Sequence, residues 1–182
     1  MIATASEMMR RGQSPSVSAV AEAAGVSRST AYRYFPTLAD MLRAVVGEAL
    51  GPILGWNPPS SPGAARLASL YGMTFPRLAE HEATFRAAIR QSLEPDAELP
   101  GDKTLGRGHR RALLQRAIAD SGLPPEQAAR LVHALSLTFG IEALIVLKDI
   151  CGLTDPEAQE VALWSAGALL EAALRQAGIK PD

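Results

Sequence analysis

The spacing of hydrophobic and polar residues predicts helices along nearly the whole chain. Three short segments with helical periodicity occupy the first fifty residues, and every longer segment after residue 63 shows the same periodicity rather than strand-like alternation. Residues 51–63 contain seven glycines or prolines and no charged residue, a composition that interrupts helices. We therefore predict an all-α protein with one domain over 1–50, a linker over 51–63 anchored by Trp56, and a second domain over 64–182.

The last third of the chain predicts two long helices. Pro125 is typical of a helix start and Gly152 of a helix end, so one helix of nearly thirty residues is expected between them. A second runs from Asp155 to Ala177, where Gly178 ends it. Both are apolar over wide arcs, which favours a homodimer formed through these two C-terminal helices. Before these two, shorter helices are expected at 64–79, 85–93 and 105–121. An exposed loop is expected at 94–104.

The composition is that of an ordinary folded domain. Of the 182 residues, 47% are hydrophobic and 20% are charged, with a formal net charge of -1. A net charge this small excludes indiscriminate binding to nucleic acid, so any contact with DNA must come from a local patch. The single cysteine, Cys151, excludes an intrachain disulfide and a cysteine-rich zinc site. We expect no metal and no cofactor, because three histidines lie in separate segments without ligand spacing: His81, His109 and His133.

No membrane partner is expected. The most apolar run, 135–147, is interrupted by polar residues and is shorter than the roughly 20 apolar residues of a membrane helix. The first residues lack the basic and apolar regions of a signal peptide. These features predict a cytoplasmic protein.

A helix-turn-helix is predicted over residues 16–35. Two helices that cross steeply around a short turn need a small residue where they touch and a turn residue that tolerates a positive φ angle; Ala21 and Gly25 meet these needs. Ser27 is placed to cap the second helix. The side chains expected to be buried between the helices are Val20, Ala24, Val26, Ala31 and Tyr34.

The first turn of the second helix has side chains suited to DNA. In a helix-turn-helix this turn enters the major groove, where its leading side chains reach base edges. Arg28 can pair bidentately with guanine, and Ser29 and Thr30 can bond to bases or phosphates. Tyr32 and Arg33 follow at positions suited to the DNA backbone.

The distribution of charge favours specific docking of this helix on DNA over a general electrostatic attraction of the whole domain to DNA. Residues 1–50 contain five basic and four acidic side chains, a net charge of only +1, whereas residues 28–34 contain two arginines and no acid. The alternative is a tight helical corner with surface arginines. The small-residue spacing, the turn glycine, the cap and the aromatic pair all agree with DNA binding and favour it.

The same residues resemble the DNA-binding signature of the TetR family of bacterial transcriptional regulators. The matching pattern reads Val20-Ala21-x-x-Ala24-Gly25-Val26-Ser27-Arg28-x-Thr30-x-Tyr32-Arg33-Tyr34-Phe35-Pro36, within a similarity over about residues 2–50. The remainder resembles the family in layout, which implies a helical ligand-binding domain whose last two long helices build a dimeric four-helix bundle. The resemblance implies that the residues contacting DNA are Ser16, Arg28, Ser29, Thr30, Tyr32, Arg33 and Tyr34.

Two positions depart from the family pattern. Leu38 stands where the family commonly has a lysine early in the helix after Pro36. This removes one phosphate contact and is expected to lower the affinity or its salt dependence. Ser29 replaces a frequent glycine and adds a hydrogen-bonding group.

A small-molecule effector is expected to bind in the second domain. Apolar walls with a few polar groups are typical of ligand pockets, and they are equally typical of a helical core, so both interpretations stay open. The candidate ligand-binding residues are Tyr71, Met73, Phe75, Phe85, Ile89, Leu114, His133 and Phe139.

The residues and the resemblance together predict a homodimeric regulator that binds a palindromic operator in double-stranded DNA, as a repressor released by an unidentified small molecule. A helical protein-interaction module without DNA affinity is the alternative that the apolar C-terminal helices leave open. An enzyme is not expected, because no nucleophile with a base, glycine-rich phosphate loop or carboxylate pair can be placed together. The sequence does not distinguish a repressor from an activator.

Overall fold

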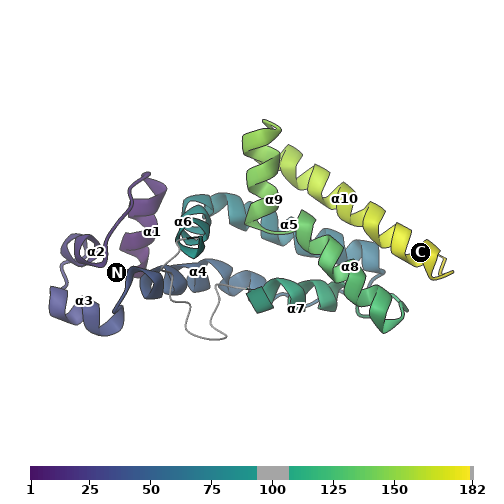
Figure 1. Ribbon diagram of the computed structural model, residues 1–182, viewed down its shortest axis with the longest axis horizontal. Helices are drawn as coiled ribbons and strands as arrows, with labels where there is room; N and C mark the ends of the chain where they lie inside the picture. Colours follow the sequence, from purple (N-terminus) through teal and green to yellow (C-terminus); the bar gives the residue numbers. More distant parts are fainter. Residues whose placement is uncertain (94–106, 181–182) are drawn as a thin grey trace. The chain divides into compact units, whose positions relative to one another are not determined.

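The computed structural model describes residues 1–93 and 107–180, and every regular element in these ranges is a helix (Figure 1). The all-α prediction is confirmed. The loop expected over 94–104 lies outside the described residues. The elements in chain order are α1 (Ile2–Arg10), α2 (Val17–Ala23), α3 (Arg28–Tyr34), α4 (Leu38–Leu54), α5 (Gly63–Glu80), α6 (Glu82–Ser92), α7 (Arg107–Ile118), α8 (Pro125–Thr138), α9 (Ile141–Ile145), the π-helix η1 (Val146–Ile150) and α10 (Asp155–Gln176).

The described helices pack as two compact units. The first contains residues 1–51 together with α6, and the second contains residues 52–79 and the chain from α7 onward. Helix α6 packs on α1, and its Ala83 and Ala87 lie against the core of the first unit. These alanines are four residues apart, so they form a small face that a neighbouring helix can approach closely. The sequence alone places this helix in the second domain, because it follows the linker.

Helix α4 continues past the expected start of the linker. The sequence predicts an interruption from residue 51, but the helix includes Pro52 and ends at Leu54. Proline removes a backbone donor, yet tertiary packing overrides this preference here because Ile53 is fully buried. Trp56 follows, also buried, and its indole N–H donates to Ser69 Oγ at 3.1 Å. Trp56 therefore anchors the shortened linker as predicted.

The second unit is built around aromatic side chains between α5 and α8. Tyr71 stacks on Phe75 with ring centroids 5.6 Å apart, and it meets Phe139 at 5.0 Å. Helix α8 packs against both α7 and α10. Helix α10 matches the second long helix of the prediction, and Thr154 begins it by donating from its backbone N–H and hydroxyl to Glu157.

The single long helix predicted between Pro125 and Gly152 is wrong. Helix α8 ends at Thr138, and the chain resumes as α9 and η1 after a break at Gly140. Gly140 has a φ of 111° and a ψ of -175°, a conformation that essentially only glycine adopts. No single described helix is long and apolar enough to cross a membrane, and α8 with residues 141–150 passes that test only as a pair bent by 43°.

Side chains from α8 itself and from α7 replace hydrogen bonds that the break removes from α8, and α5 supports one of them. In an unbroken helix, the carbonyls of Leu135 and Ser136 would accept from the N–H groups four residues further on. Leu135 O instead accepts from the Thr138 hydroxyl at 3.0 Å, which is 2.8 Å from the Tyr71 hydroxyl. Ser136 O accepts from Arg110 Nη1 at 3.3 Å. The break is therefore stabilised by one local bond and by two residues distant in sequence, Tyr71 and Arg110.

Replacing Gly140 with alanine is expected to destabilise the protein by about 1–3 kcal/mol. The added Cβ would lie 2.6 Å from Arg110 Nη2 at a positive φ, and that guanidinium is held by its ion pair with Glu142. Chemical denaturation measures the effect, with Gly167→Ala as the control. Gly167 lies inside α10 with open space at its Cβ position, so alanine there is expected to stabilise by about 0.5–1 kcal/mol. If Gly140→Ala were as stable as the wild type, the backbone strain expected for alanine at this position would be contradicted.

Tyr71 is expected to make the fold sensitive to alkaline pH. Burial raises the pKa of its hydroxyl to about 12, outweighing the opposing effects of Thr138 and Arg110. Because the folded pKa lies above the unfolded value of 10.0, the contribution of Tyr71 is complete below pH 10 and is lost as the pH rises through 12. Tyr71→Phe is expected to be about 1 kcal/mol less stable than wild type near pH 8 because it lacks the hydrogen bond. Urea denaturation should show this difference shrinking above pH 10 and changing sign before pH 12; a constant difference would refute the assignment.

Candidate nucleic-acid interface

Helices α2 and α3 meet through a turn that the local sequence dictates. Gly25 has a φ of +66°, and the N–H groups of Gly25 and Val26 donate to the carbonyls of Glu22 and Ala21 at 3.1 and 2.9 Å. These two bonds form a Schellman motif, which ends α2 and turns the chain directly into α3. The predicted helix-turn-helix is confirmed.

Serine side chains cap both helices. Ser16 Oγ accepts from the Ala19 N–H at 3.1 Å, and Ser27 Oγ accepts from the Thr30 N–H at 3.2 Å. Each cap satisfies an otherwise unpaired amide of a first helical turn, an interaction worth about 1 kcal/mol. The predicted cap at Ser27 is confirmed, and Ser16 begins α2 with its side chain exposed.

The contact between α2 and α3 buries most of the expected side chains. Those buried wholly or in part are Val20, Ala24, Val26 and Ala31. The prediction that Tyr34 is buried is wrong, because 67% of it is exposed. Tyr34 is the last residue of α3, and the following Phe35 packs against the core of the first unit instead.

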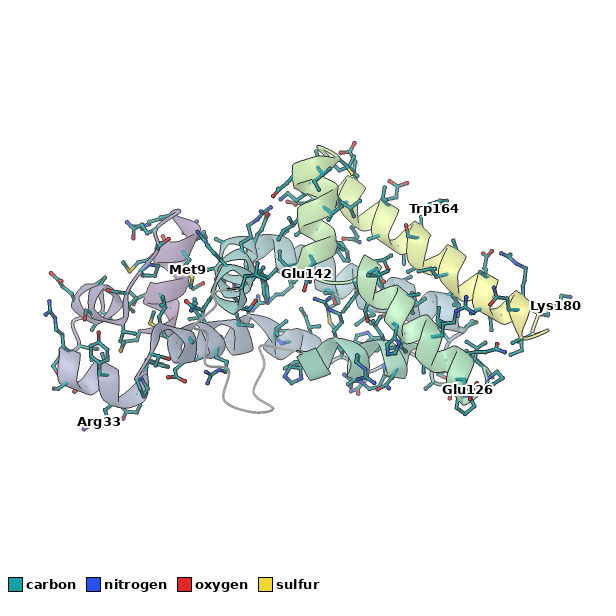
Figure 2. All side chains as sticks on the ribbon, viewed as in Figure 1. Met9, Arg33, Glu126, Glu142, Trp164 and Lys180 are labelled. Atoms are coloured by element: carbon teal, nitrogen blue, oxygen red, sulfur yellow. The ribbon has the colours of Figure 1, made fainter. Side chains whose placement is uncertain are left out.

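The structure brings six of the seven predicted DNA-contacting residues onto α3. Thr30 is half-buried, and its hydroxyl lies 2.9 Å from Ser27 Oγ. Figure 2 labels Arg33, whose side chain lies on the outer side of this helix. The exposed members on α3 are Arg28, Ser29, Tyr32, Arg33 and Tyr34.

The arginines of α3 are not neutralised by acidic side chains. Among the described residues, neither Arg28 nor Arg33 forms an ion pair, whereas Arg10 and Arg11 of α1 both pair with Glu7. The hydrogen bonds from those α1 arginines, above all Arg10, hold the pKa of Glu7 below its ordinary value. Since a carboxylate partner would compete with phosphate, the α3 arginines are the ones available to an anionic polymer.

Two contacts orient the exposed tyrosines of α3. The Tyr32 hydroxyl lies 3.1 Å from Ser18 Oγ on α2, and the Arg33 guanidinium lies 5.4 Å from the centroid of the Tyr34 ring. These contacts position the rings without burying them. The sequence does not single out Ser18, because its contact joins residues 14 positions apart and leaves no local signal.

The sequence of these N-terminal helices matches a known protein family. Residues 2–45 match the family described as "Bacterial regulatory proteins, tetR family". The chain has the N-terminal helix-turn-helix domain of this family. No curated protein sequence matches it.

Solved structures are similar in fold over most or all of the chain. A TetR transcriptional regulator from Rhodococcus sp. RHA1 is 21% identical over 93% of this chain and 92% of its own, with a TM-score of 0.66. A tetR-family regulator from Streptomyces coelicolor is 22% identical over 96% and 80%, with a TM-score of 0.69. AmtR from Mycobacterium smegmatis is 23% identical over 100% and 94%, with a TM-score of 0.52.

Leu38, where this TetR-family domain departs from the common pattern, has a structural role. It is half-buried and packs against the core of the first unit. The helix start beside it is capped by Thr37 and Asp40, whose N–H groups each donate to the other's side chain at 3.1 Å. The Thr37 hydroxyl, with a smaller effect from Arg43, lowers the pKa of the Asp40 carboxyl. A packing contact therefore stands where the family commonly has a lysine.

The candidate ligand-binding residues are divided between the two units. In the second unit, Tyr71 contacts both Phe75 and Phe139, and all three side chains are buried in the core. Leu114 is also buried in this unit, Met73 is half-buried, and His133 is exposed. Phe85 and Ile89 belong to α6 in the first unit. Within the described residues, no cluster of three or more His, Cys, Asp or Glu side chains could hold a metal ion.

Proposed function

We propose that the protein is a repressor that binds a palindromic operator as a homodimer and releases it when a small molecule binds. The observation that supports DNA binding is the surface of α3. It presents two exposed arginines without ion-pair partners among the described residues and two exposed tyrosines, on a helix held by the Gly25 turn and the Ser27 cap. Such a regulator catalyses no reaction and acts on DNA in the cytoplasm.

In this proposal α3 lies in the DNA major groove. Arg28, in the first turn, reads a guanine through two hydrogen bonds, with Ser29 beside it. Tyr32 and Arg33 bond to the phosphate backbone, as does Ser16 at the start of α2. The phosphate contacts fix the orientation of the protein on the duplex, and the base contacts supply the sequence preference.

Exposed apolar side chains on the C-terminal helices support the homodimer. Eight large hydrophobic side chains are exposed in the described structure, of which two lie on α3 and five lie in the segment from α8 to α10. Val161 and Trp164 are three residues apart on α10 and share a face, and Trp164 is 73% exposed (Figure 2). A two-fold dimer buries such a face on both protomers. The five side chains are Leu137, Val146, Ile150, Val161 and Trp164.

Two-fold symmetry determines the form of the operator. The two α3 helices of a dimer would read inverted half-sites whose centres are about 34–36 Å apart, one turn of DNA, or a multiple of this. A small molecule would weaken the complex by binding more tightly to a conformer in which this spacing is wrong. Its effect is limited to the difference between its affinities for the two conformers.

Selection of bound sequences from a random pool of double-stranded DNA tests the proposal. The expected result is a palindromic motif bound with a dissociation constant of about 10⁻⁸ M or lower. The logarithm of the affinity should fall linearly with the logarithm of the salt concentration, because phosphate contacts release counterions. A pool without enrichment would contradict DNA binding. A stoichiometric protein partner found in its place would establish the interaction-module alternative.

A further inference from the structure

A pocket of about 330 Å³ lies within the second unit, lined by the first turn of α5, the end of α7 and the C-terminal half of α10. None of the candidate ligand-binding residues named from the sequence lines it. Its volume lies at the lower end of the range for small-molecule sites, about 300–1,000 Å³. The side chains that determine its chemistry are Arg66, Asp120, Leu170, Leu174, Ile179 and Lys180.

Arg66 is the most deeply placed charge of this pocket. Its side chain is only 11% exposed; Nε donates to Ser61 O at 2.8 Å and Nη2 donates to Asp120 Oδ2 at 2.5 Å. The Asp120 side chain is 74% exposed, so the guanidinium is fixed whereas its carboxylate partner is largely in water. Because water solvates most of the Asp120 carboxylate, another carboxylate can take its place on the guanidinium while Asp120 stays hydrated. Arg66 therefore has the geometry of a preorganised anion receptor.

Glycines keep the pocket open. Gly63 begins α5 against Leu170, and a Cβ there would lie 3.3 Å from Leu170 Cδ2. Gly167 lines the pocket from inside α10, with no atom within 4 Å of the position a Cβ would occupy. Glycine inside a helix is unfavourable relative to alanine, so this position is costly for the helix and leaves empty space.

We propose that this pocket binds a small organic monocarboxylate. The carboxylate of the ligand would replace Asp120 on the Arg66 guanidinium, and its apolar part would lie against Leu170, Leu174 and Ile179. Arg is suited to this role because its planar group pairs bidentately with a carboxylate. Binding at this site stands on the pocket alone; only a role of the ligand as effector rests on the proposed function.

The charged side chains that line the pocket favour a ligand with a single negative charge. The lining contains two cations, Arg66 and Lys180, and two carboxylates, Asp120 and Glu171, and the latter also pairs with Arg175 at 3.3 Å. A dianion such as a phosphate ester would face both carboxylates. An amine would face the buried guanidinium. A monocarboxylate satisfies Arg66 while the displaced Asp120 returns to solvent.

Isothermal titration calorimetry of the full chain tests the site with three probes that share one tail: octanoate, octylamine and 1-octanol. Octanoate is expected to bind and the other two are not. Arg66→Gln is expected to weaken octanoate binding at least about tenfold, since it removes a charged hydrogen-bond donor. Asp120→Asn is expected to strengthen it several-fold, because it removes the competing carboxylate. Opposite effects of two neighbouring substitutions cannot come from general loss of folding.

A pocket-filling variant provides the second test. Gly167→Leu is expected to abolish octanoate binding and to raise the thermal midpoint, because leucine is a better helix residue than glycine. Gly72→Leu is the matched control: Gly72 lies inside α5, is exposed and does not line the pocket. It should raise the midpoint and leave octanoate affinity unchanged.

Three results would overturn the site: no octanoate binding by the wild type, preferential binding of octylamine, or full affinity in both Arg66→Gln and Gly167→Leu. The calorimetry uses no DNA, so its outcome is separate from that of the operator selection. If octanoate binds as expected and no operator is selected, the site stands and the proposed function fails. If an operator is selected and octanoate does not bind, DNA binding stands and the proposed carboxylate site fails.

Discussion

Replacing Arg28 and Arg33 together with alanine is expected to weaken operator binding at least about 100-fold and to leave the fold intact. A bidentate pair between arginine and guanine contributes about 1–3 kcal/mol of discrimination, and removing the Arg33–phosphate interaction weakens binding further. Both arginines are exposed, and neither forms an ion pair with a described residue, so their removal costs the folded state little. The affinity of the variant for the selected operator measures the loss of binding, and its thermal midpoint shows whether the fold is intact.

The two single substitutions are expected to differ in kind. Arg28→Ala should relax the sequence preference at one position of each half-site, because Arg28 is proposed to read a base. Arg33→Ala should weaken binding uniformly across sequences and reduce the salt slope by about one for each phosphate that is no longer neutralised. Repeating the selection and the salt titration with each variant separates these outcomes. The reverse pattern would contradict the proposed roles.

A matched control separates the interface from general electrostatics. Arg111→Ala with Arg175→Ala removes the same charge from exposed positions of the second unit. This control should change operator affinity by less than about threefold, because neither arginine lies on the helix proposed to contact DNA and exposed charges are screened by salt. An equal loss of affinity in control and test variants would mean that net charge, and not the α3 surface, drives binding.

The DNA-binding half was predictable because its determinants are local in sequence. Ala21, Gly25 and Ser27 act within five residues of their partners: the turn glycine closes a Schellman motif and the serine accepts from an amide three residues on. The position of Tyr34 was not predictable in this way. Whether the last residue of a seven-residue helix faces inward depends on how the chain leaves that helix, and here Phe35 takes the inward position.

The errors in the second unit have non-local causes. Nothing in the apolar run around Gly140 identifies it as a break, because Arg110, which occupies the space beside Gly140, is 30 positions away. Likewise, α6 returns to the first unit through Ala83 and Ala87, whose partners lie in α1. Periodicity shows which face of a helix is apolar, but it does not show which helix covers that face.

The candidate ligand site shows the same limit. Tyr71 and Phe139, two of the aromatic residues that the sequence suggests as pocket walls, pack against each other in the core. The pocket around Arg66 arises from glycines and from the ends of three helices, which composition cannot locate. Arg66 is distinguished from the other arginines by its burial beside the exposed Asp120, a property of the folded chain.

Replacing Trp164 with glutamate is expected to raise the dissociation constant of the proposed homodimer at least about 1,000-fold. A tryptophan at the centre of an interface commonly contributes about 2–4 kcal/mol, and in a two-fold dimer each substitution acts in both protomers. The exposed position of Trp164 means that the substitution should leave the folded monomer intact. Sedimentation velocity over a concentration series measures the dimer, and denaturation checks the monomer.

The same variant should separate dimerisation from DNA contact. A monomer retains its α3 surface, so binding to an isolated half-site should be unchanged, while affinity for the full palindrome should fall because the second half-site is no longer tethered to the first. Leu93→Glu is the matched control, since Leu93 is the one large exposed hydrophobic residue of the described structure that lies on neither α3 nor the C-terminal helices. It should sediment as a dimer. A dimer that survives Trp164→Glu, or dissociates equally with Leu93→Glu, would place the subunit contact elsewhere than on α10.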